Sequence, residues 1–240
     1  SQGIRQQHLG PGALDGLLMK TLASNLVMIA AIALAATTVR DAPAAPLPPV
    51  GGTTNVVPPD ASTLDARALV SNACSKCHGA NGVSISPLFP ILAAQRPGYI
   101  EMELQLFRQR ERSDPHARAF MWGIARALTD EQIEGLAQYF SSQPPASGTP
   151  SRDPALAQKG KMIYENGVPE RDILACLPCH GPNAEGVHTF PRLAGQHRDY
   201  LARELHEFTG QLRESEVMHR FTQNLTEGEI AAVTEYLASK

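Results

Sequence analysis

The sequence predicts an all-α protein built from two small tandem domains, preceded by a single transmembrane helix. Three observations support this prediction: a repeat of about 100 residues, helix-initiating sequences at matching places in both copies, and an uncharged apolar run near the amino terminus. A repeat of this length indicates a duplicated domain, because solenoid repeats have periods of roughly 20–50 residues. Neither copy contains the alternating pattern that is typical of strands.

The repeat is visible at an offset of 101 residues, where 89–95 (FPILAAQ) matches 190–196 (FPRLAGQ). Farther along, the offset falls to 97 residues, because the first copy has four extra residues before Met121. A middle helix is predicted in each copy from apolar residues at helical spacing. These residues are Ile100, Leu104 and Phe107 in the first copy and Leu201, Leu205 and Phe208 in the second.

Helices are also expected at both ends of each copy. The first helix of copy one should run from about residue 62 into the first cysteine motif, and its counterpart should begin at about Pro154. The last helices should begin at Thr129–Gln132 and Thr226–Glu229, which are capping boxes that satisfy free backbone N–H groups. Apolar residues at helical spacing follow each box, at Ile133, Leu136 and Phe140 and at Ile230, Val233 and Leu237.

All four cysteines lie in two Cys-x-x-Cys-His motifs. This pentapeptide is typical of covalent c-type haem attachment: each thiol adds to a haem vinyl group, and the histidine is placed under the iron as an axial ligand. A thioredoxin-like dithiol would need a βαβ context, and a zinc site would need two close cysteine pairs. Those alternatives remain, but two covalently bound haem c groups are the prediction. Their expected ligands are Cys74, Cys77 and His78, and Cys176, Cys179 and His180.

A sixth iron ligand is expected downstream of each histidine, at matching positions of the repeat. Met121 and Met218 meet both conditions, and Met/His ligation raises the reduction potential in cytochromes c. A packing role in the core is the alternative for either methionine. Met102 has no methionine at its matching position and is interpreted as packing. His219 competes with Met218, although Trp122 occupies its matching position.

A ligand histidine needs an acceptor for its other ring nitrogen. Pro90 and Pro191 follow their histidines by twelve and eleven residues, and their carbonyl groups are candidate acceptors. The alternative is that each proline only shapes a loop. Other histidines, such as His116 and His206, lack a histidine partner in the repeat. They are expected at the surface or in support of a ligand.

With these motifs the chain resembles the dihaem cytochrome c4 family of tandem class I cytochromes c. The resemblance covers about residues 62–240 and rests on Cys-x-x-Cys-His-Gly, Phe-Pro-x-Leu-Ala-x-Gln-x-x-x-Tyr and Met before Leu-Thr-x-x-x-Ile in each half. It implies two all-α haem domains related by an approximate two-fold, with haems close enough for fast electron exchange. The iron ligands that it implies are His78, Met121, His180 and Met218, with Pro90 and Pro191 as histidine partners.

The expected organisation is an amino-terminal segment (1–40), a proline-rich tether (41–60), domain one (61–143), a linker (144–154) and domain two (155–240). Residues 21–39 are uncharged, and a helix of that length just spans a bilayer at about 1.5 Å per residue. A cleaved signal peptide beginning near Met19 is the alternative. Arg5 and Lys20 precede the run, which places the haem domains in the periplasm, anchored to the inner membrane or soluble.

A net charge of −3 indicates no nucleic-acid partner. Two six-coordinate haems leave no open iron position for a small-molecule substrate, so the sequence predicts an electron carrier and no catalytic residues. The resemblance implies service between quinol:cytochrome c reductase and a terminal haem-copper oxidase in a bacterial respiratory chain. One alternative is a fixed haem subunit of a membrane-associated oxidase or periplasmic dehydrogenase. A haem peroxidase with a labile ligand at Met121 is another.

Charge also gives a docking hypothesis for the first domain. An arginine-rich stretch could face an acidic partner; alternatively, these arginines pair with haem propionates or nearby carboxylates, or are solvated. The arginines are Arg96, Arg108, Arg110 and Arg112, and the carboxylates are Glu111 and Asp114.

Overall fold

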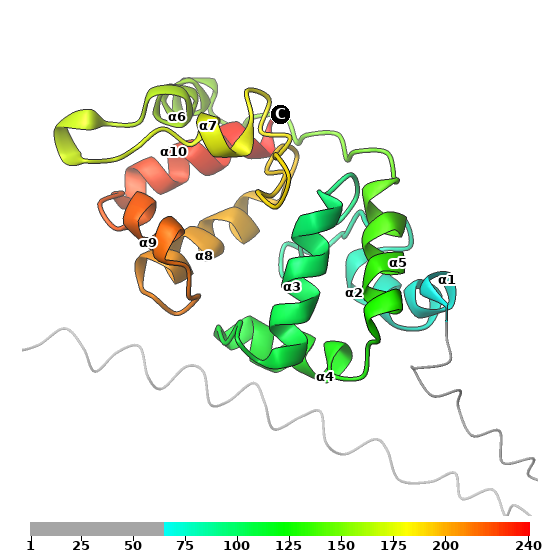
Figure 1. Ribbon diagram of the computed structural model, residues 1–240. Helices are drawn as coiled ribbons and strands as arrows, with labels where there is room; N and C mark the ends of the chain where they lie inside the picture. Colours follow the sequence, from blue (N-terminus) through cyan, green and yellow to red (C-terminus); the bar gives the residue numbers. More distant parts are fainter. Residues whose placement is uncertain (1–64) are drawn as a thin grey trace, which may run out of the picture. The chain divides into compact units, whose positions relative to one another are not determined.

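The computed structural model describes residues 65–240, which lie within one compact unit of the chain, residues 56–240 (Figure 1). The predicted membrane segment (21–39) and the tether (41–60) lie outside the described residues. Among the residues that are described, no helix is both long enough and apolar enough to cross a membrane.

The described chain is helical, and its only bridges are two isolated ones, Val168–Ile173 and Val187–Phe190. Domain one contains α1 (Ala66–Leu69), α2 (Ser75–His78), α3 (Pro97–Gln109), α4 (Trp122–Ala125) and α5 (Asp130–Ser141). Domain two contains α6 (Pro154–Asn166), α7 (Leu177–His180), α8 (Arg198–Thr209), α9 (Glu216–Thr222) and α10 (Glu227–Ala238). Two π-helical turns, Val70–Cys74 and Ala117–Met121, precede α2 and α4. A short 3-10 turn, Pro169–Arg171, follows α6.

Both predicted capping boxes are present. The hydroxyl group of Thr129 accepts from the backbone N–H of Gln132 at 3.2 Å, and the Gln132 side chain accepts from the Thr129 backbone at 3.0 Å. At the start of α10, the Glu229 carboxylate accepts from the Thr226 backbone N–H at 2.9 Å. The first helix begins after Asp65, whose carboxylate accepts from Ala68 N at 2.8 Å. The chain then passes through a π-helical turn before it reaches α2.

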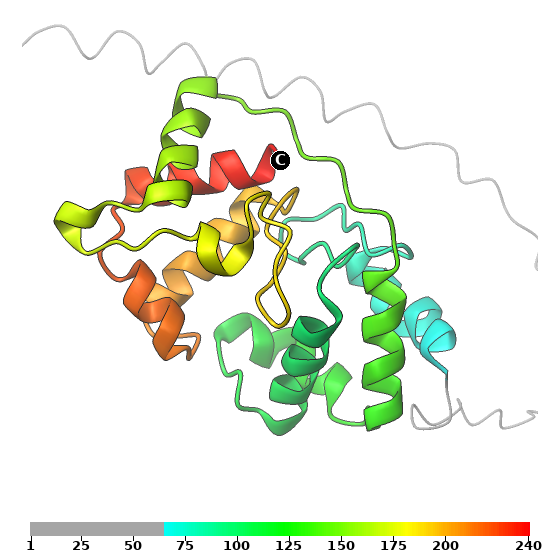
Figure 2. The ribbon, with the colours of Figure 1, turned by 45° about the horizontal axis from the view of Figure 1, so that its top comes forward.

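The first and last helices of each domain cross where one residue has no side chain. In domain two α6 and α10 lie side by side (Figures 1 and 2), and a Cβ atom on Gly160 would lie 1.9 Å from the Ala232 carbonyl oxygen. In domain one a Cβ atom on Gly135 of α5 would lie 2.9 Å from Ala66 Cβ on α1. Gly135 and Ala232 occupy matching positions in the repeat. The glycine therefore lies on the last helix in domain one and on the first helix in domain two, but both domains keep the close crossing.

Gly160→Ala should therefore destabilise domain two. The new methyl group would overlap backbone rather than a movable side chain, and overpacking costs about 1–3 kcal/mol or more. Gly228→Ala is the matched control, because nothing lies within 4 Å of its added Cβ atom and alanine favours helix. Guanidinium unfolding of the haem-loaded protein, followed by circular dichroism, measures both. Equal stability of the two variants would contradict the close crossing.

The two domains meet through reciprocal contacts of their matching loops (Figure 2). The Gln95 side chain donates to Arg192 O at 3.0 Å and accepts from Arg192 N at 2.7 Å. The Gln196 side chain makes the same pair of bonds with Ile91, at 3.0 and 2.9 Å. Since Gln95 matches Gln196 and Ile91 matches Arg192, the contacts are those of an approximate two-fold relation.

A buried cluster of four charged side chains occupies the same interface. Arg112 contacts Glu103 at 2.5 Å and Glu204 at 3.0 Å, and Arg213 pairs with the same two glutamates. Each of these four side chains is only 8–9 % exposed. Glu103 matches Glu204 and Arg112 matches Arg213 in the repeat, so the cluster repeats the two-fold relation of the glutamine contacts.

The docking hypothesis is wrong for Arg112. Its guanidinium group is buried and bonded to carboxylates, including Asp114 at 2.8 Å, so it cannot face a partner protein. Arg108 is also paired, with Asp130 at 2.6 Å. The alternative of pairing with Asp114 therefore accounts for Arg112, whereas the partner of Arg108 is a carboxylate that the sequence did not indicate.

Candidate cofactor sites

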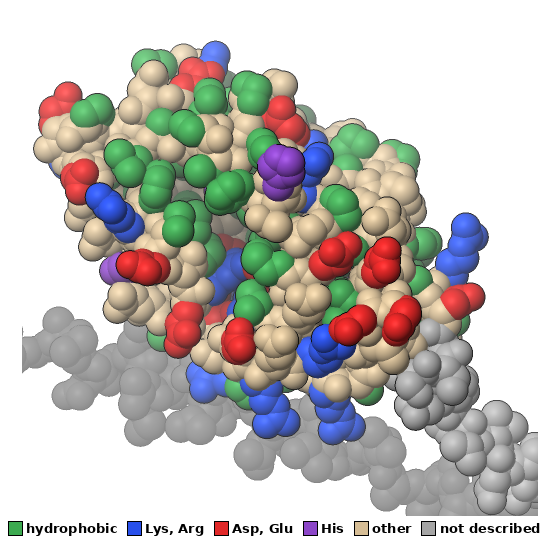
Figure 3. All heavy atoms as spheres, in the orientation of Figure 1, with side chains coloured by type: hydrophobic (Ala, Val, Ile, Leu, Met, Phe, Trp, Pro, Cys, Tyr) green, Lys and Arg blue, Asp and Glu red, His purple; other side chains and the backbone are tan. Residues whose placement is uncertain are grey.

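A cavity of about 1180 Å³ extends through both domains. In Figure 3, apolar side chains surround a hollow on the face shown. Pockets for one small ligand usually measure roughly 300–1,000 Å³, so this cavity has room for more than one. All the predicted site residues line it: Cys74, Cys77, His78, Pro90 and Met121 in domain one, and Cys176, Cys179, His180, Pro191 and Met218 in domain two.

Short helices hold the cysteine motifs. Cys77 and His78 lie on α2, and the equivalent pair lies on α7. Each helix ends at a glycine with positive φ, +78° at Gly79 and +83° at Gly181. A Cβ atom on Gly79 would also lie 2.4 Å from the Val83 carbonyl oxygen. The glycine after each histidine is therefore needed for the chain to turn back along the cavity.

The histidine rings are held in one tautomer. His78 Nδ1 lies 2.9 Å from the Pro90 carbonyl oxygen, and His180 Nδ1 lies 3.0 Å from that of Pro191, the hydrogen bonds expected from the sequence. A carbonyl oxygen only accepts, so Nδ1 carries the proton and Nε2 offers a lone pair. Burial lowers the pKa of both rings, although the proline carbonyl groups oppose this shift. Both rings are therefore neutral at pH 7, the state in which imidazole binds a metal.

Two phenylalanines contact these rings. Phe89 meets His78 edge to face at 6.1 Å between ring centroids, and Phe190 meets His180 at 6.3 Å. The sequence shows both within the repeated Phe-Pro motif, but nothing in the pattern shows that they touch the histidines. The sequence signal for a shared role was that Phe89 and Phe190 occupy matching positions of the repeat.

The cysteines do not fit dithiol or zinc chemistry. Burial raises the pKa of Cys74 to about 11 and that of Cys176 to about 12, whereas reactive dithiols have a lowered pKa. Among the described residues, the side chains close enough to share a metal ion include no cysteine. Unpaired thiols beside a large apolar cavity and a neutral histidine instead fit a covalently bound haem.

The two methionines reach the cavity from different local structures. Met121 ends a π-helical turn and packs against the core of domain one. Met218 lies in the first turn of α9, where the hydroxyl group of Ser215 accepts from its backbone N–H at 3.2 Å. His219 is not among the residues that line the cavity, and its Nδ1 lies 3.0 Å from the Phe208 carbonyl oxygen. The geometry thus favours Met218 over its neighbour as a ligand.

The comparisons with known proteins agree with two tandem cytochrome c domains. The cytochrome c family model matches residues 64–144 and 157–240. Cytochrome c4 of Thiocapsa roseopersicina is 38% identical over 177 residues, which cover 71% of this chain and 88% of that relative. The solved structure of Acidithiobacillus ferrooxidans cytochrome c4 has a TM-score of 0.66 and 35% identity, over 70% of this chain and 98% of that one.

A third relative carries a different name. The thiosulfate dehydrogenase electron acceptor of Stutzerimonas stutzeri is 34% identical over 173 residues, 70% of this chain and 78% of that relative.

Proposed function

The chain belongs to the cytochrome c family, as a dihaem member of the cytochrome c4 kind, and we propose that it carries single electrons from quinol:cytochrome c reductase to a terminal haem-copper oxidase. Two covalent haem c groups, attached through the cysteine pairs at 74 and 77 and at 176 and 179, supply one-electron redox chemistry. The relatives named cytochrome c4 are electron carriers, which supports a carrier rather than an enzyme.

The proposed iron ligands are His78 with Met121 and His180 with Met218. Support comes from the fixed tautomer of both histidines, which presents Nε2 to the metal, and from the place of both methionines on the cavity wall. If these four residues hold the two irons, neither haem would offer a site to a substrate. Pro90 and Pro191 act through the histidines by accepting the Nδ1 proton.

One observation carries the electron-transfer proposal: the two ligand sets line a single cavity that continues from one domain into the other. The reciprocal glutamine contacts and the buried charge cluster hold the domains together around it. An electron entering one domain can then leave through the other without the domains separating.

The test uses host membranes. Purified, fully reduced protein should be reoxidised by washed inner-membrane vesicles in air, and cyanide should block this step. Quinol added with the reductase should reduce the oxidised protein again. Failure of both reactions would contradict the respiratory assignment.

A second candidate follows from the relative named as an electron acceptor of thiosulfate dehydrogenase. In that role the chain would be a fixed haem partner of a periplasmic dehydrogenase. This role predicts that the chain co-purifies with a dehydrogenase at constant stoichiometry, and that the substrate of that dehydrogenase reduces the haems without quinol.

Fast binding of carbon monoxide to one haem of the native protein would instead support the peroxidase alternative and contradict six-coordination.

Met218→Ala should lower the reduction potential of one haem by on the order of 0.1 V, part of the roughly 0.8 V range that axial ligands span. It should also remove half of the far-red methionine–iron absorption. Met162→Leu is the control, since Met162 lies on α6, is exposed and does not line the cavity, so its replacement should leave both potentials unchanged. Spectroelectrochemical titration measures both effects. An unaltered far-red band in Met218→Ala would exclude this residue as a ligand.

We place the carrier on the periplasmic side of the inner membrane, where c-type haem is attached in bacteria. The apolar run 21–39 lies outside the described residues, and its role as an anchor is a prediction of the sequence. Haem-stained fractions of the native host test it. A full-length band in washed membranes supports the anchor, and a shortened band in the soluble periplasm contradicts it.

A further inference from the structure

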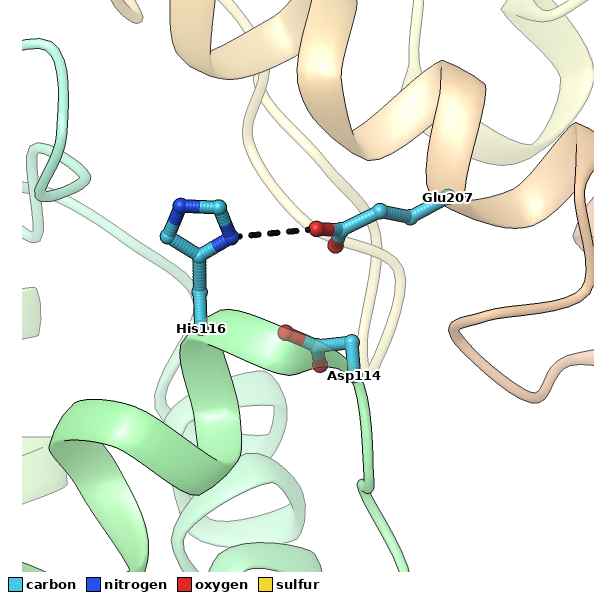
Figure 4. Close-up of side chains that lie close together, drawn as sticks. All are labelled: Asp114, His116 and Glu207. Carbon is cyan, nitrogen blue, oxygen red and sulfur yellow. Dashed lines mark hydrogen bonds and ion pairs between the residues drawn. The ribbon is translucent and has the colours of Figure 1, made fainter.

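A group of ligand-type side chains lies at the domain interface, and one of them, His116, also lines the cavity of the cofactor sites. Asp114 and His116 belong to the stretch of domain one that contains the four extra residues, and Glu207 lies on α8 of domain two (Figure 4). One ligand atom from each of the three lies within 4.8 Å of the others. His116 Nδ1 lies 3.2 Å from Glu207 Oε1.

The electrostatic surroundings of this group favour a cation. Three arginines face four carboxylates in and beside the buried cluster, which leaves an excess of one negative charge when all four are ionised. The side chains are Arg112, Arg203, Arg213, Glu103, Glu204, Asp114 and Glu207. Uncompensated charge is costly to bury, and a cation beside Asp114 and Glu207 would offset it.

Glu207 supplies a second, independent observation. Its side chain is only 6 % exposed, and its Oε2 is buried without a hydrogen-bond partner among the described residues. Such an atom needs an explanation, because buried polar atoms are nearly always paired. In Figure 4 the Glu207 carboxylate points toward both His116 and Asp114.

Asp114 is already held in position for a ligand role. Its side chain has no exposed surface, and it accepts from Arg112 Nε at 2.8 Å and from Ala117 N at 2.9 Å. A carboxylate has about four acceptor positions, so two remain for a metal ion. Partners of this kind orient metal-binding carboxylates.

We propose that Asp114, His116 and Glu207 bind one divalent transition-metal ion of the zinc class across the domain interface. Imidazole nitrogen and carboxylate oxygen bind zinc at about 2.0–2.2 Å, which sets tetrahedral ligand atoms about 3.4 Å apart. The His116–Glu207 separation of 3.2 Å is already of that size. His116 is 34 % exposed and also lines the cavity, so its ring leaves room for a water ligand on the ion. The imidazole ligand disfavours Mg²⁺ and Ca²⁺, which prefer oxygen.

The experiment titrates the oxidised dihaem protein with zinc chloride by calorimetry at pH 7, with zinc counted by mass spectrometry after dialysis. We expect one zinc ion per chain. His116→Ala and Glu207→Gln should each weaken binding by roughly tenfold or more. His206→Ala is the matched control, because His206 and Glu227 form an exposed pair at 3.5 Å outside the three-residue group. This variant should bind zinc as the unaltered protein does.

Three results would overturn the proposal. The first is no saturable binding below about 100 µM zinc. The second is binding that survives both His116→Ala and Glu207→Gln in proteins whose circular dichroism is unchanged. The third is a zinc-dependent loss of the far-red methionine–iron band with the same stoichiometry, which would place the ion at an axial ligand. His116→Gln replaces His116→Ala if the alanine variant does not fold.

Discussion

Replacing Cys176 and Cys179 together by alanine is expected to remove one of the two covalent haems and to unfold domain two. The core of this domain also forms the wall of the cavity, so loss of the haem takes away a packing partner of its apolar side chains. They include Ile163, Tyr164, Leu201, Val233 and Leu237. A domain of this size is close to the lower limit for a self-sufficient core. Covalent haem per chain should fall by half, and helical circular dichroism should fall with it.

Pro178→Ala is the control for this change. Pro178 lies between the two cysteines and is exposed, so its loss removes no thiol and should leave both haems attached. Replacing Cys74 and Cys77 should instead remove the haem of domain one. Two covalent haems remaining in the Cys176/Cys179 variant would show that attachment does not need this motif.

Local signals explain why so much of each domain is predictable. A capping box is complete within four residues, as at Thr129–Gln132, and a haem motif within five. His78 and Pro90 are also only twelve residues apart in the sequence, so a single loop can place them at hydrogen-bond distance. The repeat then doubles every observation, because a feature that appears at the same place in both copies is unlikely to be accidental.

The interface follows from a different kind of information. Whether Arg112 faces water or a second domain depends on how α3 and α8 approach each other, and no local pattern encodes that approach. A usable signal was nevertheless present. Glu103 and Glu204, like Arg112 and Arg213, recur at the offset of 101 residues that relates the two Phe-Pro segments. Charged residues retained in both copies indicate a shared structural role rather than a docking surface in one copy.

Arg213→Met should destabilise the haem-loaded protein by about 3–5 kcal/mol, because it leaves two buried carboxylates with Arg112 as their only shared cation. Arg213 pairs with Glu103 and Glu204 and also donates to the Tyr99 hydroxyl at 3.0 Å. Guanidinium unfolding at pH 7 measures the loss. Arg108→Met is the control, since its partner Asp130 is 79 % exposed and such pairs contribute about 1 kcal/mol or less.

The effect should depend on pH. Burial raises the pKa of Glu103, but Arg213 and Arg112 together hold it below its ordinary value of 4.5. A lowered pKa stabilises the folded protein above the ordinary value, and this stabilisation is lost as the pH falls through the folded value. The difference between Arg213→Met and the unaltered protein should therefore be largest near neutral pH and shrink below about pH 4.5. A constant difference across that range would mean that Arg213 acts by packing alone.

The matching variant Arg112→Met tests the two-fold relation itself. Both arginines pair with the same two glutamates, but Arg112 also bonds Asp114 at 2.8 Å and accepts the Trp122 indole N–H on its carbonyl group at 2.8 Å. The carbonyl contact is unaffected by the side-chain change, whereas the Asp114 contact is lost. This buried ion pair should outweigh the hydrogen bond that Arg213 donates to Tyr99, so Arg112→Met should cost more than Arg213→Met. Equal costs would mean that Asp114 is stabilised by other contacts at the interface and that the symmetric part of the cluster alone joins the domains.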